Sequence, residues 1–201
     1  MQFPTLNMLL FSLLGAFAAP IIHEMVRVRV SAALGDTQPY NKGFLTWNPI
    51  KFFEPIGFVL MLLFNVGWAR PTPLSNYHYR NRRSGMILTY TMPIVVSLFI
   101  GVITLFLWQY IPAQENMSVI RLIVRHFAYA NISVAIINTI IPVFPFGANA
   151  LLKLFVSPEA VVKINHNEKM LQIIFIFALV FGLISRVINP ILAFIATLII
   201  L

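Results

Sequence analysis

The residues best suited to chemistry are His23 and Glu24, which are adjacent near the end of the first long apolar stretch. On a helix, the pattern H-E-x-x-H places two His side chains on one face, where they bind zinc beside a Glu that activates the metal-bound water. In this chain the fourth position after His23 is Arg27. A guanidinium stays protonated and has no lone pair to offer a metal. The sequence therefore keeps part of a zinc-binding pattern and places a cation where a ligand would be.

Glu24 and Arg27 are three residues apart, so their side chains can pair on one helix. A bare carboxylate at membrane depth is costly. We therefore expect Arg27 to fill the space that zinc would occupy, to neutralise Glu24 and to donate to His23. Without further motifs, His23 and Glu24 are more typical of polar helix-end groups that reach the headgroup region.

The composition predicts an integral membrane protein. Apolar residues make up 59% of the 201 residues and charged residues 10%, with a mean hydropathy of +0.86, whereas a soluble domain is about 25% charged. The net charge of +8 lies on loops rather than on a polar scaffold, which argues against nucleic acid as a partner. The chain has no cysteine, which excludes disulfides and thiolate chemistry.

The apolar stretches predict an all-α polytopic bundle of about four or five transmembrane helices in one domain, 1–201. The expected helices are 6–30, 85–111, 118–144 and 170–201, with a re-entrant, partly extended region at 31–84. We expect Arg186 and Asn189-Pro190 to kink or break the last stretch. The sequence does not decide whether residues 170–201 form one helix or two. Gly15 and the alanines after it predict close helix packing.

The apolar segment 55–69 either spans or re-enters the membrane. If it spanned, two equally basic loops would lie on opposite sides, against the positive-inside bias. If it re-enters, eleven of the 14 cations share one face. We therefore expect a re-entrant segment and a multi-pass protein of a bacterial cell membrane, with its basic loops in the cytoplasm.

Further along the chain, specific motifs recur in a fixed order. They are G-D at 35–36, G-F-L-T-W-N-P at 43–49, G-W-A-R-P-T-P at 67–73, R-R at 82–83 and N-T-I-I-P-V-F-P-F-G at 138–147. This order resembles the small bacterial site-2 protease family of intramembrane zinc metalloproteases over about residues 15–155. That family has H-E-x-x-H, G-D, G-R-L-T-L-N-P, G-W-A-K-P, R-R and N-x-x-P-x-P-P-L-D-G in the same order.

The resemblance implies that the zinc ligands fall at His23, Arg27 and Gly147, and two of these three positions hold residues that cannot bind zinc. The family's A-G-P-x-x-N reads T-M-P-I-V-V at 91–96, so a polar Asn is also replaced. Glu54 stands in place of an Asp, and Phe52 or Phe53 in place of a His. His23 and Glu24 are thus vestigial catalytic residues. The resemblance also marks structural or groove positions, which are Arg27, Asn48, Pro49, Trp68, Asn138, Pro142 and Pro145.

Other side chains could in principle complete a metal site. His126 lies 21 residues before Gly147, which on a helix is roughly 30 Å away. Asn149 is close to the replaced Asp but is a poor zinc ligand. The sequence leaves Asp36, Glu54 and His78 open as loop candidates.

These observations predict a catalytically degenerate site-2-protease-like protein without zinc or another cofactor. It would act as a scaffold or accessory subunit that binds another membrane protein within the bilayer. The alternative is an active zinc-dependent intramembrane protease with unconventional ligands. A small transporter is disfavoured, since the chain has no inverted repeat and no line of ionisable groups along a pathway.

Overall fold

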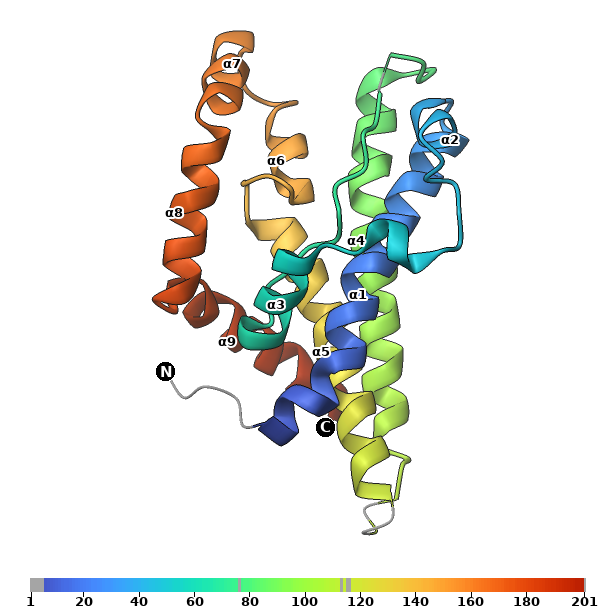
Figure 1. Ribbon diagram of the computed structural model, residues 1–201, viewed down its shortest axis with the longest axis vertical. Helices are drawn as coiled ribbons and strands as arrows, with labels where there is room; N and C mark the ends of the chain where they lie inside the picture. The colour runs from blue at the N-terminus through green and yellow to red at the C-terminus, as the bar shows by residue number, and fades with distance from the viewer. Residues whose placement is uncertain (1–5, 76, 113, 115–116, 201) are drawn as a thin grey trace.

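The computed structural model describes residues 6–112, 114 and 117–200, except for residue 76. Its elements in chain order are α1 (Leu6–Ala33), α2 (Gln38–Asn41), the 3-10 helix η1 (Pro49–Phe52), α3 (Pro55–Phe64), α4 (Arg82–Trp108), α5 (Ser118–Ile140), α6 (Gly147–Leu152), α7 (Pro158–His166), α8 (Glu168–Val180) and α9 (Leu183–Ile200) (Figure 1). The described residues contain no strand. The predicted all-α class is confirmed.

Three helices, α1, α4 and α5, are each long and apolar enough to cross a membrane. The helices α8 and α9 pass the same test only together, and they are bent by 67° at the break between them. The fold is therefore that of a multi-pass membrane protein with three or four candidate spans. We predicted four or five spans. The structure has four if the bent pair α8 and α9 counts as one span, and three if it does not.

The predicted helices 6–30 and 85–111 are observed as Leu6–Ala33 and Arg82–Trp108. Two further differences have a clear physical cause. The last apolar stretch breaks at Gly182, whose φ of 75° ends α8, and not at Arg186 or Pro190, which lie inside α9. The predicted helix 118–144 ends at Ile140, because Ile141 precedes Pro142 and takes an extended conformation with φ −88° and ψ 106°. A residue before proline is pushed out of the helical region by the proline ring.

The core of the molecule is the packing of α1, α4 and α5 against one another (Figure 1). The buried residues of α4 recur every fourth position, as Gly85, Thr89, Pro93, Ser97, Gly101 and Leu105. At Gly101 an added Cβ would lie 2.5 Å from Ile132 Cγ1 of α5, and at Gly15 it would lie 3.0 Å from Ala130 Cβ. The close helix packing predicted around Gly15 is confirmed, and small residues allow it.

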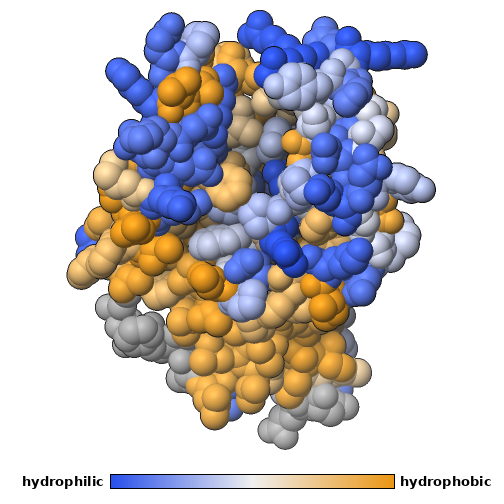
Figure 2. Space-filling model, turned by 45° about the horizontal axis from the view of Figure 1, so that its top comes forward, coloured by the Kyte–Doolittle hydropathy of each residue, from blue (hydrophilic) through white to orange (hydrophobic). Residues whose placement is uncertain are grey.

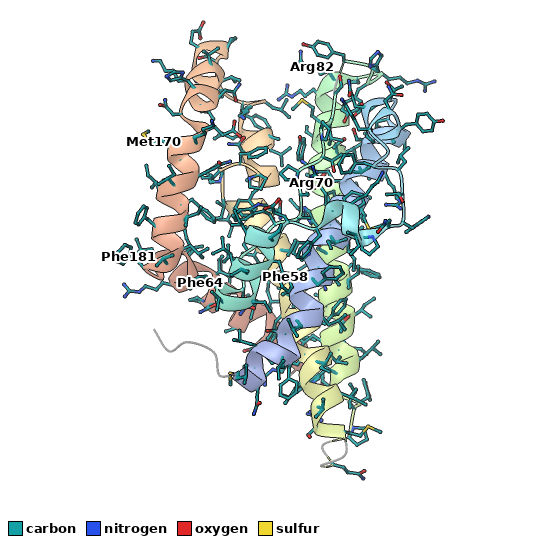
Figure 3. All side chains as sticks on the ribbon, viewed as in Figure 1. Phe58, Phe64, Arg70, Arg82, Met170 and Phe181 are labelled. Carbon is teal, nitrogen blue, oxygen red and sulfur yellow. The ribbon has the colours of Figure 1, made fainter. Side chains whose placement is uncertain are left out.

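A hairpin follows η1. It consists of α3 and a return segment (residues 65–75), which begins with Asn65 in the left-handed region at φ 55°. The Arg70 backbone N–H donates to the carbonyl of Phe52 at 2.8 Å, so the chain comes back to where the hairpin began. Figure 3 shows Phe58 and Phe64 of α3 midway along the molecule, far from Arg82 at the start of α4. Ten residues make a helix about 15 Å long, too short to cross about 30 Å of hydrocarbon. Re-entry into a membrane stays a prediction.

A buried polar network joins the end of α1 to the start of α4. The Asp36 carboxylate accepts hydrogen bonds from the Ser31 hydroxyl at 2.8 Å and from the Ser75 backbone N–H at 2.8 Å. The Ser31 hydroxyl also lies 2.6 Å from the Tyr79 hydroxyl, which in turn lies 3.1 Å from that of Thr89. Asp36 therefore has a structural role in this fold, holding the loop before α4 against α1.

Polar and apolar residues separate along the length of the molecule. Figure 2 shows hydrophilic residues gathered at one end, around a hollow, and a broad apolar band below them. The hydrophilic end is where α4 begins, with Arg82 and Arg83 in its first turn, and where α7 lies (Figure 1). This separation is typical of a protein whose apolar band lies in lipid.

The contact between Gly57 and the return segment yields a first prediction. An added Cβ at Gly57 would lie 2.0 Å from the backbone oxygen of Trp68. We expect Gly57→Ala to lower the unfolding free energy by about 1–3 kcal/mol, because backbone atoms must shift to make room. Thermal unfolding in mild detergent measures this. The control is Gly147→Ala, whose Cβ would make only ordinary contacts at 3.5 Å; equal melting temperatures for the two variants would contradict the prediction.

Candidate functional site

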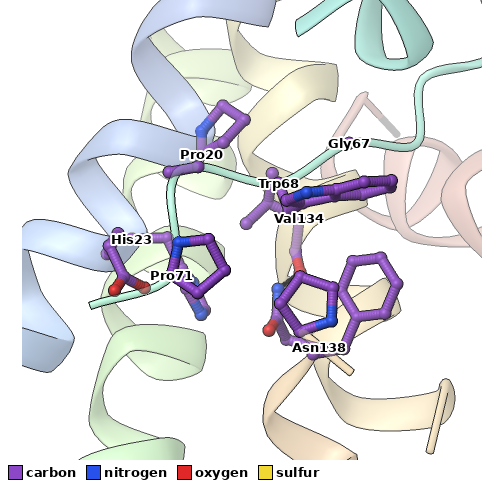
Figure 4. A pocket seen from close by; sticks show the side chains of 11 residues that line it. Pro20, His23, Gly67, Trp68, Pro71, Val134 and Asn138 are labelled. Carbon is purple, nitrogen blue, oxygen red and sulfur yellow. Dashed lines mark hydrogen bonds between the residues drawn. The ribbon is translucent and has the colours of Figure 1, made fainter. Parts of the chain in front are cut away.

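The predicted catalytic positions meet at a small cavity between α1, the return segment and the turn from α5 to α6. This His23 cavity is lined by Pro20, His23, Glu24, Gly67, Trp68, Ala69, Pro71, Val134, Asn138, Pro145 and Phe146 (Figure 4). Its volume is about 20 Å³, which is room for about one water molecule. Figure 4 shows His23 and Pro71 close together, with Trp68 and Asn138 across the cavity.

His23 is buried and anchored to α4. Its Nδ1 lies 3.0 Å from the hydroxyl of Ser97, which belongs to the buried stripe of α4. The expected hydrogen bond from Arg27 to His23 is therefore corrected: the ring nitrogen has Ser97 as its partner. Packing explains the difference, because the stripe of small residues brings α4 close enough for its hydroxyl to reach α1.

Glu24 and Arg27 form the predicted ion pair. The Arg27 guanidinium donates to Glu24 Oε1 at 2.5 Å, and the two residues are only 7% and 6% exposed. The same carboxylate oxygen accepts the backbone N–H of Thr72 at 2.8 Å, which ties the return segment to α1. The guanidinium also lies over the ring of Tyr90, 5.4 Å from its centre. Both charges are thus held by three elements of the fold.

The turn from α5 to α6 carries the third family position. The side-chain oxygen of Asn138 accepts the backbone N–H of Gly147 at 2.9 Å, and its side-chain nitrogen donates to the carbonyl of Val134. Asn149 donates to the carbonyl of Pro142 at 3.0 Å, and the Phe144–Pro145 peptide bond is cis. These bonds fix the turn beside the cavity.

Arg27 and Gly147 lie near the same residue of α4. An added Cβ at Gly147 would be 3.5 Å from the backbone oxygen of Tyr90, whose ring the Arg27 guanidinium covers. The three positions that the resemblance assigns to zinc ligands therefore fall in one region of the fold. The assignment of these positions to a metal site stays a prediction.

The donor set at this region does not fit a catalytic zinc site, which uses three protein ligands. His23 and Glu24 are the donors present, and the carboxylate already pairs with a fixed cation. Among the described residues, no three His, Asp or Glu side chains are grouped closely enough to hold a metal ion. A guanidinium beside the site would also repel a divalent cation.

The loop candidates left open by the sequence lie elsewhere. Asp36 is bound in the network at the end of α1, and His78 lines a different cavity at the start of α4. Glu54 precedes α3 and lines a pocket beside Phe52 rather than the His23 cavity. His126 lies on α5 with Nδ1 2.7 Å from the carbonyl of Leu122, and it does not line the His23 cavity.

The predicted groove residues divide into two sets. Trp68, Asn138 and Pro145 line the His23 cavity, and Pro142 supports the turn beside it. In contrast, Asn48 caps η1 by accepting the backbone N–H of Ile50 at 3.0 Å, and Pro49 begins that helix. Asn48 and Pro49 are therefore exposed residues of a turn rather than lining residues.

Sequence reasoning missed Thr72, Tyr90 and Ser97. The backbone N–H of Thr72 carries no sequence signal, and Tyr90 is one aromatic residue among many. Ser97 had a detectable signal, because it belongs to the small and polar residues that recur at every fourth position of α4. Such spacing is typical of a helix face packed closely on another helix.

The fold and the site define a multi-pass helical membrane protein with a buried His23, Glu24 and Arg27 at a small cavity. The chain is 27% identical over 178 residues to the protein named "Putative zinc metalloprotease YwhC" of Bacillus subtilis (strain 168), covering 85% of this chain and 80% of that protein. This similarity supports a site-2-protease-like relationship. No family model matches the chain, and no solved structure matches it.

The buried ion pair yields a second prediction. Arg27→Leu leaves the Glu24 carboxylate buried without its cation, which typically costs about 3–5 kcal/mol of unfolding free energy. We expect a clearly lower melting temperature in detergent, and partial recovery when Glu24→Leu is added. Arg70→Leu is the control, because it removes the same charge from an exposed position. The idea fails if Arg27→Leu melts like the unaltered protein.

Proposed function

We propose that this protein is a catalytically silent relative of site-2 proteases that binds a partner within the membrane, as a scaffold or accessory subunit. The observation that carries the proposal is the buried ion pair of Glu24 and Arg27 at the position where such proteases need a second His. The glycine at position 147, where they need an Asp, supports it further.

The chemistry of Glu24 supports the loss of hydrolysis. A Glu that activates water must be able to accept a proton from it. Here Glu24 Oε1 accepts hydrogen bonds from both the Arg27 guanidinium and the Thr72 N–H. Both hydrogen bonds tie this oxygen to structural partners, and the cation beside it comes from the same helix. Glu24 therefore has a structural role under this proposal, and no reaction step passes through it.

The segments that border the His23 cavity support a binding role. The hairpin and the turn at Pro145 still border the His23 cavity, with Trp68 packed edge-on against Phe146 at a ring distance of 5.9 Å. The spans also expose long apolar faces that can pack against another helix. We propose that the partner is another membrane protein and that no nucleic acid or cofactor is involved.

The alternative function is an active zinc-dependent protease with unconventional ligands. One observation favours it: Nδ1 of His23 lies 3.0 Å from the Ser97 hydroxyl, and an outer hydrogen-bond partner of this kind orients the His ligands of zinc sites. The relative is also named a zinc metalloprotease. Zinc would supply a polarised water if it were bound, and further ligands would have to come from residues that move.

Zinc content separates the two functions. We expect less than about 0.1 zinc per chain in protein purified in mild detergent, because a structural or catalytic site needs three to four ligands. We expect the double variant Arg27→His, Gly147→Asp to bind zinc at close to one per chain, since a side chain at position 147 has room. Elemental mass spectrometry makes the measurement.

The single variant Arg27→His is the control for this experiment, because it removes the cation but leaves the third ligand absent. Near-stoichiometric zinc in the unaltered protein, removed by His23→Ala, would overturn the proposal in favour of the alternative. A double variant that folds normally but takes up no zinc would show that the region is not a former metal site.

The partner is tested by photo-crosslinking in the native membrane. We expect benzoylphenylalanine at Trp68, beside the His23 cavity, to give one discrete crosslinked protein. The same group at Phe194 is the matched aromatic control, because that residue is 64% exposed on α9, away from the cavity. Equal crosslinking at both positions, or none at Trp68, would contradict a partner at the cavity.

A further inference from the structure

A second cavity lies at the start of α4, between that helix and the end of α1. This Arg80 cavity has a volume of about 500 Å³ and is lined by Ala33, Leu34, Gly35, His78, Tyr79, Arg80, Asn81, Ser84, Gly85 and Leu88. It shares no residue with the His23 cavity. It lies at the hydrophilic end of the molecule, where α1 and α4 meet (Figure 1).

The polar lining of this cavity is suited to an anion. Arg80 and His78 are exposed donors on the loop, and Ser84 adds a hydroxyl from the first turn of α4. Within the described part of the chain, Arg80 forms no ion pair with a carboxylate. Asp36, which follows the lining residue Gly35, is buried and accepts hydrogen bonds from Ser31, Ser75 and Gln38.

The surroundings add further positive charge. Arg82 and Arg83 lie in the first turn of α4, where they stack over Tyr77 and Phe155 at 5.9 and 5.6 Å. The first-turn N–H groups of a helix of 27 residues also present partial positive charge at this end. Both effects favour a phosphate over a neutral ligand.

The apolar part of the cavity continues into an exposed stripe on α4. Leu88 lines the cavity one turn below Ser84, and it is followed on the same face by exposed apolar residues, Met92, Val95, Phe99 and Ile103. Their spacing of three or four residues keeps them on one side of the helix. A molecule with a phosphate in the cavity would therefore meet an apolar track leading toward the middle of the span.

We propose that the Arg80 cavity binds the phosphate of an anionic phospholipid, whose acyl chains lie along the Leu88 stripe of α4. The group that is bound is an anionic phosphate ester, which a soluble phosphate ester also carries. The apolar track distinguishes the two, because a soluble ester gains nothing from it. This site is independent of whether the His23 cavity performs any reaction.

Native mass spectrometry of the detergent-purified protein tests the site. It measures the dissociation constant for phosphatidylglycerol beside phosphatidylcholine and sn-glycerol 3-phosphate. We expect phosphatidylglycerol to bind more tightly than either. We expect Arg80→Gln to weaken it about fivefold, as the loss of one cation near an anionic lipid predicts.

The matched control is Lys163→Gln, which removes a cation from an exposed position on α7 outside the cavity. We expect it to change phosphatidylglycerol binding less than about twofold, since surface charges act weakly at a distance. Equal losses in the two variants would overturn the site in favour of general surface charge. Equal binding of phosphatidylcholine or of sn-glycerol 3-phosphate would overturn the proposed anionic phospholipid.

Discussion

The fold depends on burying one pair of opposite charges, Glu24 and Arg27, inside a largely apolar molecule. Neither charge would be tolerated alone at this depth, because desolvation costs several kcal/mol per ion. The pair is stable only if other groups complete its environment. The Thr72 N–H from the return segment and the Tyr90 ring from α4 do so, and the ion pair thereby joins three elements.

Close approach of backbones makes this environment possible. Gly57 lets the return segment lie directly against α3, and Gly101 lets α4 lie directly against α5. A larger side chain at either position would move the segment that delivers Thr72 or the helix that carries Ser97 and Tyr90. The hydrogen bonds of His23 and Glu24 therefore depend on close backbone packing at Gly57 and Gly101, which lie outside the site.

The similarity to the protein named "Putative zinc metalloprotease YwhC" can be compared with this geometry. The similarity covers most of both chains, and the family-like motifs form the hairpin, the turn at Gly147 and the network at Asp36. Under the proposed function, the positions that hold the metal in such proteases are occupied here by Arg27 and Gly147. Under our two proposals, the scaffold binds a partner protein, and the Arg80 cavity binds a lipid at a separate site.

The sequence by itself determined the helical class, the apolar spans and the proximity of Glu24 to Arg27, because these follow from composition and from the period of one helix. It also predicted that positions 23, 27 and 147 belong together, through motif order. It could not determine that His23 meets Ser97, 74 residues away, or that Glu24 meets the amide of Thr72, 48 residues away. It placed the last helix break at Arg186 and Asn189-Pro190, whereas Gly182 forms it. These features were decided only by the tertiary structure, because contacts between distant segments depend on how helices pack and on which backbone groups remain to be satisfied.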